Sequence, residues 1–97
     1  MFRKALVTLA AISALGASAS AIAATECKLY PENERIPAEK FQQQLQEQGY
    51  KIRKFKETRG NCYEIYGFDK AGKKVEIYFD MKTGEIVKRN EQVHDTL

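Results

Sequence analysis

The chain has 97 residues, of which 43 % are hydrophobic and 30 % are charged, with two Cys, no Trp and a formal net charge of +3. This length is expected to form one small domain, which excludes an enzyme built from separate cofactor and substrate domains. The first 24 residues contain no acid; of the 16 basic residues, all but Arg3 and Lys4 belong to the remainder, which has 14 basic and 13 acidic residues. A net charge of +1 gives little overall support for binding to nucleic acid or another polyanion.

Residues 1–23 have the order of a secretory signal peptide. A basic pair is followed by an uncharged run rich in Leu, Val, Ile and Ala, and Ala21, Ile22 and Ala23 supply the small-x-small pattern that predicts cleavage after Ala23. A retained membrane anchor is the alternative, because a spanning helix needs roughly 20 apolar residues. Ser and Gly in the second half of the run make it weakly apolar, however. We therefore expect a periplasmic or secreted protein that meets the membrane only transiently, through its signal peptide.

Export gives the two cysteines a structural interpretation. In an oxidising compartment an even number of Cys in a small domain indicates a disulfide, and Cys27 and Cys62 allow only one intramolecular pair. Redox catalysis is disfavoured because the closely spaced Cys-x-x-Cys pair is missing from the sequence. Metal binding would need more ligands than two Cys and the lone His94 provide. We expect no metal and no cofactor.

An extended arm and then one helix are predicted to open the domain. Residues 24–36 mix charges with Pro and Asn and show no sustained periodicity, so they are predicted to form an extended arm tethered by the disulfide. Pro37 is suited to the first helical position and Gly49 is placed to end the helix. Phe41 and Leu45 are four residues apart and share one face of it.

From residue 50 the hydrophobic period changes to two, which predicts strands. The segments 50–57, 61–69 and 74–80 are rich in Tyr, Ile, Val and Phe and are separated by turn residues. A short returning strand is expected after Gly84, and residues 90–97 are expected to be a flexible tail. The predicted fold class is α+β, with one N-terminal helix packed on a three- to four-stranded antiparallel meander sheet.

The second turn predicts a register. If Asp69 faces Lys73, the pairs Gly67–Val75, Ile65–Ile77 and Tyr63–Phe79 share one apolar face, which should lie under the helix. The opposite, outer face should then hold Glu64, Tyr66 and Phe68 beside Lys74, Glu76 and Tyr78. In the first strand, Ile52 and Phe55 have opposite parity, so both can point inward only if the strand is bulged or bent.

This order of elements resembles the PepSY domain, which is named for peptidase propeptides and a spore-associated protein. The resemblance covers about residues 37–89. The matching residues are Gly49, Tyr50, Tyr63, Glu64, Ile65, Asp69, Gly72, Val75, Glu76, Ile77, Tyr78, Phe79, Asp80, Thr83, Gly84, Glu85 and Ile86. The two Cys are similar to those of small exported proteobacterial PepSY proteins, in which one Cys precedes the helix and another precedes the Tyr-Glu pair.

The resemblance implies binding rather than catalysis. PepSY domains occur in the propeptides of thermolysin-like metallopeptidases and in stand-alone exported proteins for which peptidase regulation has been suggested. No catalytic residue set is carried over from the family, so the resemblance is a fold-level analogy. It implies a non-catalytic interaction protein that modulates or inhibits an envelope or secreted peptidase, with a protein partner and no nucleic acid; nothing in the sequence predicts the oligomeric state.

The residues themselves also favour a protein that is not an enzyme. Residues 24–97 contain no Ser, which removes a Ser-His-Asp hydrolase. Glu64 and Glu76 could form a carboxylate pair for acid–base chemistry, but they are at non-opposing positions of the predicted register. Charged and aromatic residues that alternate with a core face are ordinary for a half-exposed sheet.

Two surfaces are candidate binding sites. One is the aromatic outer face, formed by Glu64, Tyr66, Phe68, Glu76 and Tyr78, which is equally well explained as cross-strand pairing that only stabilises the sheet. The other is the basic first strand, with Lys51, Arg53, Lys54 and Lys56, which makes the alternative function a binding module for an anionic envelope component. Strand alternation is expected to divide these four cations between both faces, which favours a guard against edge-to-edge aggregation.

Overall fold

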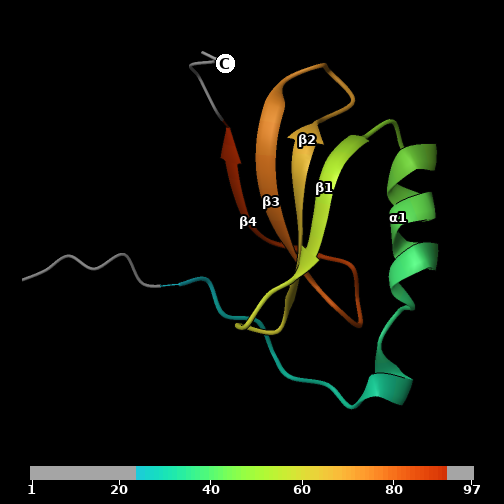
Figure 1. Ribbon diagram of the computed structural model, residues 1–97, viewed down its shortest axis with the longest axis vertical. Helices are drawn as coiled ribbons and strands as arrows, with labels where there is room; N and C mark the ends of the chain where they lie inside the picture. The colour runs from blue at the N-terminus through green and yellow to red at the C-terminus, as the bar shows by residue number, and fades with distance from the viewer. Residues whose placement is uncertain (1–23, 92–97) are drawn as a thin grey trace, which may run out of the picture.

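A computed structural model describes residues 24–91 as one helix beside a four-stranded antiparallel sheet (Figure 1). The predicted signal peptide, residues 1–23, and residues 92–97 with His94 lie outside the described residues. The elements are the 3-10 helix η1 (Glu32–Glu34), the helix α1 (Ala38–Glu47), and the strands β1 (Lys51–Glu57), β2 (Cys62–Phe68), β3 (Lys74–Asp80) and β4 (Ile86–Glu91). The predicted α+β class is confirmed, with four strands.

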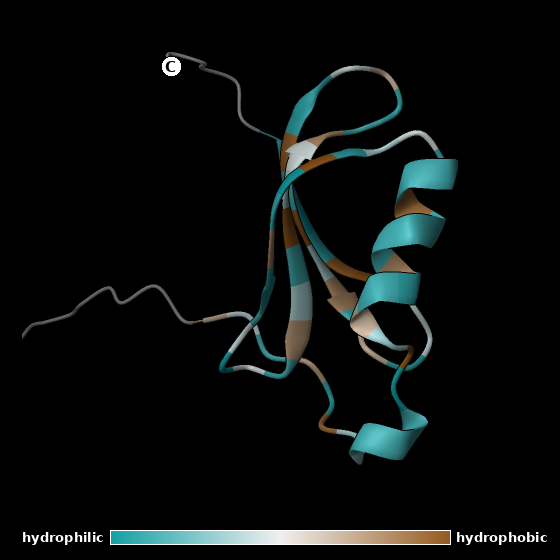
Figure 2. Cartoon of the chain, turned by 45° about the vertical axis from the view of Figure 1, so that its right-hand side comes forward, coloured by the Kyte–Doolittle hydropathy of each residue, from teal (hydrophilic) through white to brown (hydrophobic). Residues whose placement is uncertain are grey.

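The ends of α1 follow the two residues that were expected to set them. Pro37, predicted to be the first helical residue, is instead the N-cap, because its extended backbone (φ −56°, ψ 137°) precedes the first turn, which begins at Ala38. At the other end Gly49 adopts φ +105°, a left-handed conformation that suits glycine and terminates the helix. Most of the helix is hydrophilic, with short hydrophobic bands (Figure 2).

The N-terminal arm is less extended than predicted, because η1 interrupts it. The arm is fixed at two points by backbone hydrogen bonds: Cys27 N–H donates to the carbonyl of Gly60 (2.8 Å) and Ile36 N–H to that of Met81 (2.8 Å). The expected disulfide joins Cys27 to Cys62 at the start of β2. These contacts hold the arm against the lower end of the sheet.

The strands form a meander in the order β1-β2-β3-β4. The predicted β2–β3 register is confirmed pair by pair, from Tyr63 opposite Phe79 to Gly67 opposite Val75. Asp69 N–H donates to Lys73 carbonyl (2.8 Å), which closes the hairpin. β4 is longer than the returning strand that was expected, since it includes Asn90 and Glu91.

The core lies between α1 and one face of the sheet. The ring of Phe41 stacks on Tyr63 (5.3 Å between centroids) and meets the edge of Phe79 (5.0 Å). The buried cluster consists of Tyr30, Phe41, Leu45, Tyr63, Ile65, Val75, Ile77, Phe79 and Met81. The apolar ladder predicted to lie under the helix is therefore the core, and the opposite side of the sheet is left to other contacts.

Candidate functional site: the outer face of the sheet

The side of the sheet turned away from α1, here called the outer face, contains both sets of residues singled out in the sequence. Directly paired residues share a face, so the register assigns the members strand by strand. They are Lys51, Lys54 and Lys56 on β1, Glu64, Tyr66 and Phe68 on β2, Lys74, Glu76 and Tyr78 on β3, Lys88 and Asn90 on β4, and, at the end covered by the arm, Cys62 and Asp80. Arg53 has no partner in the register and is placed on this face by its position over the Phe68 ring.

A bulge in β1 gathers the basic residues on this face. The β1–β2 register shifts between Ile52 and Lys54, so Arg53 is the extra residue. Both Ile52 and Phe55 pack against the core, which their opposite parity allows only in a bulged or bent strand. The expectation that alternation divides the cations between two faces is wrong, because the bulge reverses the parity of the strand at Arg53.

Three of these cations lie over partners on β2. The Arg53 guanidinium is 5.6 Å from the ring centroid of Phe68, and Lys54 Nζ is 5.8 Å from that of Tyr66. Lys56 Nζ lies 4.0 Å from Glu64 Oε1. Cation–π contacts at exposed sites are worth only about 0.5–1 kcal/mol each. They orient the cations while leaving their charges available to a partner.

Two carboxyl groups meet at the centre of the outer face. Glu64 is only 2 % exposed, and its Oε2 atom is buried without a hydrogen-bond donor. Glu76 is its diagonal neighbour across the β2–β3 pair, and two carboxyl groups can hydrogen-bond to each other only when they share a proton. Burial, and then the hydrogen bond with Glu76, raise the pKa of Glu64.

The pKa of Glu76 is shifted in the opposite direction. Burial disfavours its ionised form, but interactions with Glu64, Tyr78 and Asn90 outweigh that effect and lower the pKa of Glu76. Tyr78 donates its hydroxyl to Oε2 (2.9 Å) and Asn90 its amide to Oε1 (3.2 Å). Burial and hydrogen bonds to these carboxylates raise the pKa values of Tyr66 and Tyr78. The pKa of Glu64 is therefore raised and that of Glu76 lowered, so Glu64 is the first of the two to take up a proton as pH falls.

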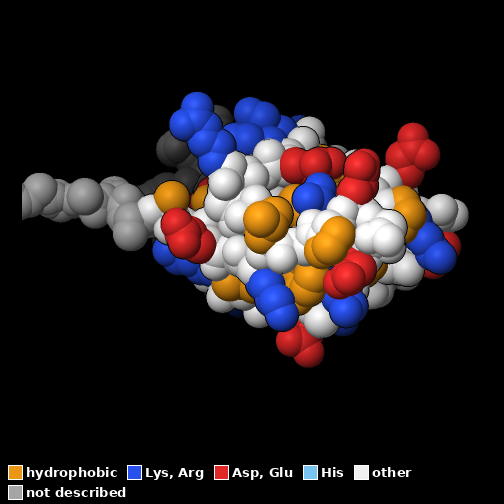
Figure 3. All heavy atoms as spheres, turned by 90° about the horizontal axis from the view of Figure 1, so that it is seen from below, with side chains coloured by type: hydrophobic (Ala, Val, Ile, Leu, Met, Phe, Trp, Pro, Cys, Tyr) orange, Lys and Arg blue, Asp and Glu red, His pale blue; other side chains and the backbone are white. Residues whose placement is uncertain are grey.

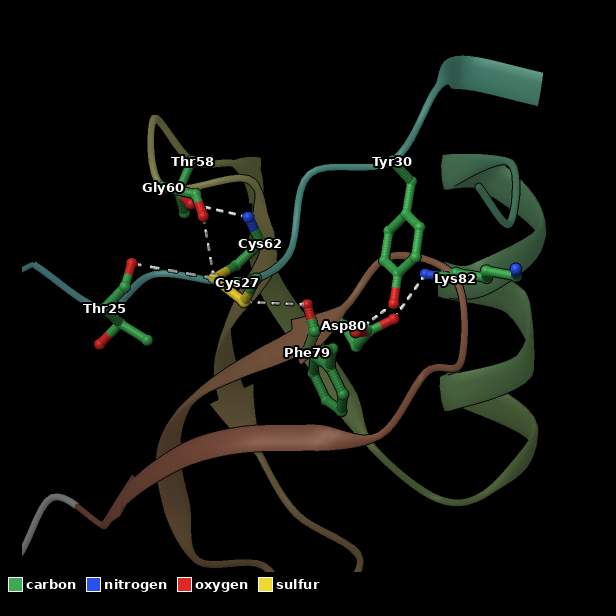
Figure 4. Close-up of a disulfide and its surroundings, with 9 residues drawn as sticks. All are labelled: Thr25, Cys27, Tyr30, Thr58, Gly60, Cys62, Phe79, Asp80 and Lys82. Carbon is green, nitrogen blue, oxygen red and sulfur yellow. Dashed lines mark hydrogen bonds between the residues drawn. A yellow bond between two sulfur atoms is a disulfide. The ribbon is translucent and has the colours of Figure 1, made fainter. Parts of the chain in front are cut away.

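The lower end of this side of the sheet is closed by the arm (Figure 4). Cys62 lies two residues before Glu64, on the same side of β2, and forms the disulfide with Cys27. At the end of β3 the Tyr30 hydroxyl donates to Asp80 Oδ2 (2.9 Å), and Lys28 and Lys82 both lie over the Tyr30 ring. The covered end leaves the outer face open above it.

Three outer-face residues were missed as site residues in the sequence. Lys74 pairs with Phe68, Lys88 with Tyr78, and Asn90 with Glu76. Lys74 appeared in the sequence only as a neighbour of the aromatic face, and Asn90 was assigned to the tail. The signal that could have found Lys88 and Asn90 is the period of two continuing from Ile86 into the returning strand.

The remaining surface offers weaker candidates. A shallow pocket beside the bulge is lined by Lys51, Arg53, Phe68 and Lys70, among others. Viewed from below, basic and acidic side chains are interspersed (Figure 3). Within residues 24–91, no helix is both long and apolar enough to cross a membrane, and no three His, Cys, Asp or Glu side chains gather as metal ligands.

The arrangement is one of exposed cations around a buried acid. Such a face can attract and orient an anionic group, since the ammonium and guanidinium groups reach solvent. In comparison with known families, a family model described as the peptidase propeptide and YPEB domain matches residues 6–90, well over half of the chain. No curated protein and no solved structure matches the chain.

Proposed function

The chain belongs to the PepSY family, the peptidase propeptide and YPEB domain, and from this premise we propose that it is a non-catalytic interaction protein that modulates an envelope or secreted peptidase. The family is associated with peptidases through its propeptide members. The observation that supports the proposal in this chain is the outer face, which the only long helix of the described residues leaves uncovered. Export, with cleavage after Ala23, is part of the proposal.

The same face supports the absence of catalysis. Glu64, the acid whose pKa is raised, is almost completely buried. Glu76 is held by Tyr78 and Asn90. A general acid or base must reach the atom that it protonates or deprotonates. The accessible groups here are cations and aromatic edges, which are typical of recognition.

A peptidase assay tests this function. Oxidised full chain, recovered after export, is added to the secreted and periplasmic fractions of the producing cells, and hydrolysis of fluorescently labelled casein is followed. We expect a concentration-dependent change in rate that is weakened by Tyr66→Ala on the outer face. Leu29→Ala is the matched control, because Leu29 is 63 % exposed and lies on the arm. No change in rate with the wild-type chain would reject the function.

One observation favours a second candidate, a binding module for an anionic envelope component. The bulge at Arg53 brings the four basic residues of β1 to a single face, which makes them a more continuous patch than simple alternation allows. Binding of this kind should fall steeply with ionic strength. A contact with a peptidase through aromatic side chains should be less sensitive to salt.

A further inference from the structure

Of the four cations of β1, here called the basic row, three lie over or beside side chains of β2. The row consists of Lys51, Arg53, Lys54 and Lys56. Arg53 and Lys54 are held over aromatic rings, and Lys56 beside Glu64. Gly67 stabilises the underlying geometry, because its bare backbone lets the chain of β1 approach at Lys51 and Ile52. The row is thus built into the edge of the sheet.

Charge is distributed unevenly between the outer face and the rest of the molecule. Residues 24–91 contain 14 basic and 12 acidic side chains. Six of the basic side chains but only three of the acidic ones, Glu64, Glu76 and Asp80, lie on this side of the sheet, and Asp80 is at the end covered by the arm. The rest of the described chain therefore has eight basic and nine acidic side chains. A near-neutral chain presents one positive face, whose charge steers a partner to that side.

The acids in the open part of this face, Glu64 and Glu76, are less exposed than its cations. Glu64 is 2 % exposed and its charged form is disfavoured by burial. Glu76 accepts hydrogen bonds from Tyr78 and Asn90, which occupy both of its oxygens. By contrast, all four residues of the basic row are exposed. An incoming anion would meet cations before it meets either carboxyl group.

We propose that the outer face is the docking surface for an acidic polypeptide segment of the partner, which lies along β1 with its carboxylates on the basic row. This inference rests on the proposed function, since it names the chemistry of the peptidase-side contact. Alternate side chains of an extended segment are spaced by roughly 7 Å, as are those of a strand. Carboxylates on every second residue can therefore follow the cations of β1.

A polypeptide fits this face better than a lipid bilayer does. Peripheral membrane binding usually combines cations with apolar side chains that insert below the headgroups. In the described part of the chain the large exposed hydrophobic residues are Leu29, Ile86 and Val87. Leu29 is on the arm, and Ile86 and Val87 are on β4, which β2 and β3 separate from β1. The basic row has no large exposed hydrophobic residue beside it.

The test measures binding of a fluorescently labelled peptide of twelve alternating Glu and Gly residues to the oxidised full chain. Lys54→Gln/Lys56→Gln removes two charges from the row. Lys40→Gln/Lys73→Gln removes two exposed charges from α1 and the hairpin turn and serves as the matched control. We expect at least a tenfold loss of affinity for the row variant, equal to about 1.4 kcal/mol, and less than a twofold loss for the control. Circular dichroism confirms that both variants fold.

Three outcomes would overturn the inference. They are equal losses in both variants, no binding of the peptide by the wild-type chain, and binding of phosphatidylglycerol vesicles that the peptide fails to displace. The last outcome would assign the face to the membrane instead. The casein assay separates this inference from the proposed function: if the row variant alters casein hydrolysis as fully as wild type does, only the acidic docking surface is rejected.

Discussion

Asp69 and Arg89 are twenty residues apart and are joined by an ion pair of 2.6 Å that ties the β2–β3 hairpin to the last strand. Asp69 is 9 % exposed, and its other oxygen accepts the backbone N–H groups of Ala71 (2.9 Å) and Lys73 (2.8 Å). The Asp69 carboxylate thus stabilises both the β2–β3 turn and the contact between this turn and β4. Its position explains why the chain stays in the sheet through Glu91 instead of fraying at Asn90.

Asp69→Asn is expected to lower the urea midpoint at neutral pH, because it replaces a hydrogen bond between charged groups with a weaker, neutral contact to Arg89. The Arg89 guanidinium, together with the N–H groups of the turn, lowers the pKa of Asp69 below 3.8. Its stabilising effect is therefore complete above that value and is lost as pH falls through the lowered pKa. Urea unfolding should show a wild-type advantage at pH 7 that shrinks toward pH 2.

Lys73→Gln is the control for this experiment. Lys73 also pairs with a carboxylate, Glu91 at 3.9 Å, but both side chains are largely exposed. Exposed pairs contribute roughly 0–1 kcal/mol, so the midpoint of unfolding should barely move. A wild-type advantage over Asp69→Asn that is the same at pH 7 and pH 2 would contradict the assigned role of the carboxylate.

Glu64→Gln is expected to stabilise the protein relative to wild type as pH rises. Burial, and then the neighbouring carboxyl group of Glu76, raise the pKa of Glu64 above 4.5 in the folded state. The stabilising contribution of the neutral form is then full below about pH 4.5 and is lost as pH rises through the raised pKa. Gln is neutral throughout and its amide can donate to Glu76. The urea midpoints should agree near pH 4 and separate toward pH 8.

Glu76→Gln should give the opposite result at neutral pH. The pKa of Glu76 is lowered, so the fold favours its ionised form, which accepts hydrogen bonds from Tyr78 and Asn90. Removing that charge weakens both bonds and should destabilise the protein above pH 4.5. If Glu64→Gln and Glu76→Gln change the stability in the same direction, the pKa values of the two carboxyl groups are not shifted in opposite directions as described.

The disulfide should contribute a large share of the total stability. Cys27 and Cys62 are 35 positions apart, and a loop of that size corresponds to about 4 kcal/mol in the chain-entropy account. Small domains are stable by only about 5–15 kcal/mol. Cys27→Ser/Cys62→Ser should therefore lower the urea midpoint strongly, and wild type treated with dithiothreitol should match it. A loss below 1 kcal/mol would show that the arm is secured by its other contacts, such as Tyr30 with Asp80.

The sequence was sufficient for the elements whose ends depend on local chemistry. Pro37 and Gly49 bound the helix because one fixes the extended backbone before it and the other adopts the left-handed conformation after it. The β2–β3 register follows from the hairpin between Asp69 and Lys73, since a short turn leaves one register in which apolar residues share a face. These local features were enough to predict which residues of α1, β2 and β3 form the core, without knowledge of the tertiary structure.

The outer face could not be predicted as well, because it depends on where β1 breaks its alternation. The opposite parity of Ile52 and Phe55 predicted a bulge or bend in β1 if both residues face the core. It did not indicate which residue of the strand is the extra one. In the structure the extra residue is Arg53, and the bulge at this position places the four cations of β1 on one side of the sheet. The burial of Glu64 is a further consequence of packing, since it results from neighbours on three strands rather than from its own position in a half-exposed strand.

Gly67→Ala tests the link between the bulge and the outer face. A Cβ atom at Gly67 would overlap the backbone carbonyl of Lys51, and a backbone atom cannot rotate away as a side chain can. β1 must therefore shift, which should cost about 2–3 kcal/mol and displace the basic row. We expect a lower urea midpoint and, at a temperature where the variant is still folded, weaker binding of the Glu-Gly peptide.

Gly72→Ala separates strain from displacement. A Cβ atom at Gly72 meets nothing within 4 Å, but the residue has φ +84°, so the substitution is strained by about 1–2 kcal/mol without moving β1. Both variants should lose stability, and only Gly67→Ala should lose affinity for the acidic peptide. Retained affinity in Gly67→Ala would show that binding does not depend on the position of β1, because the displaced strand would still present the cations equally well.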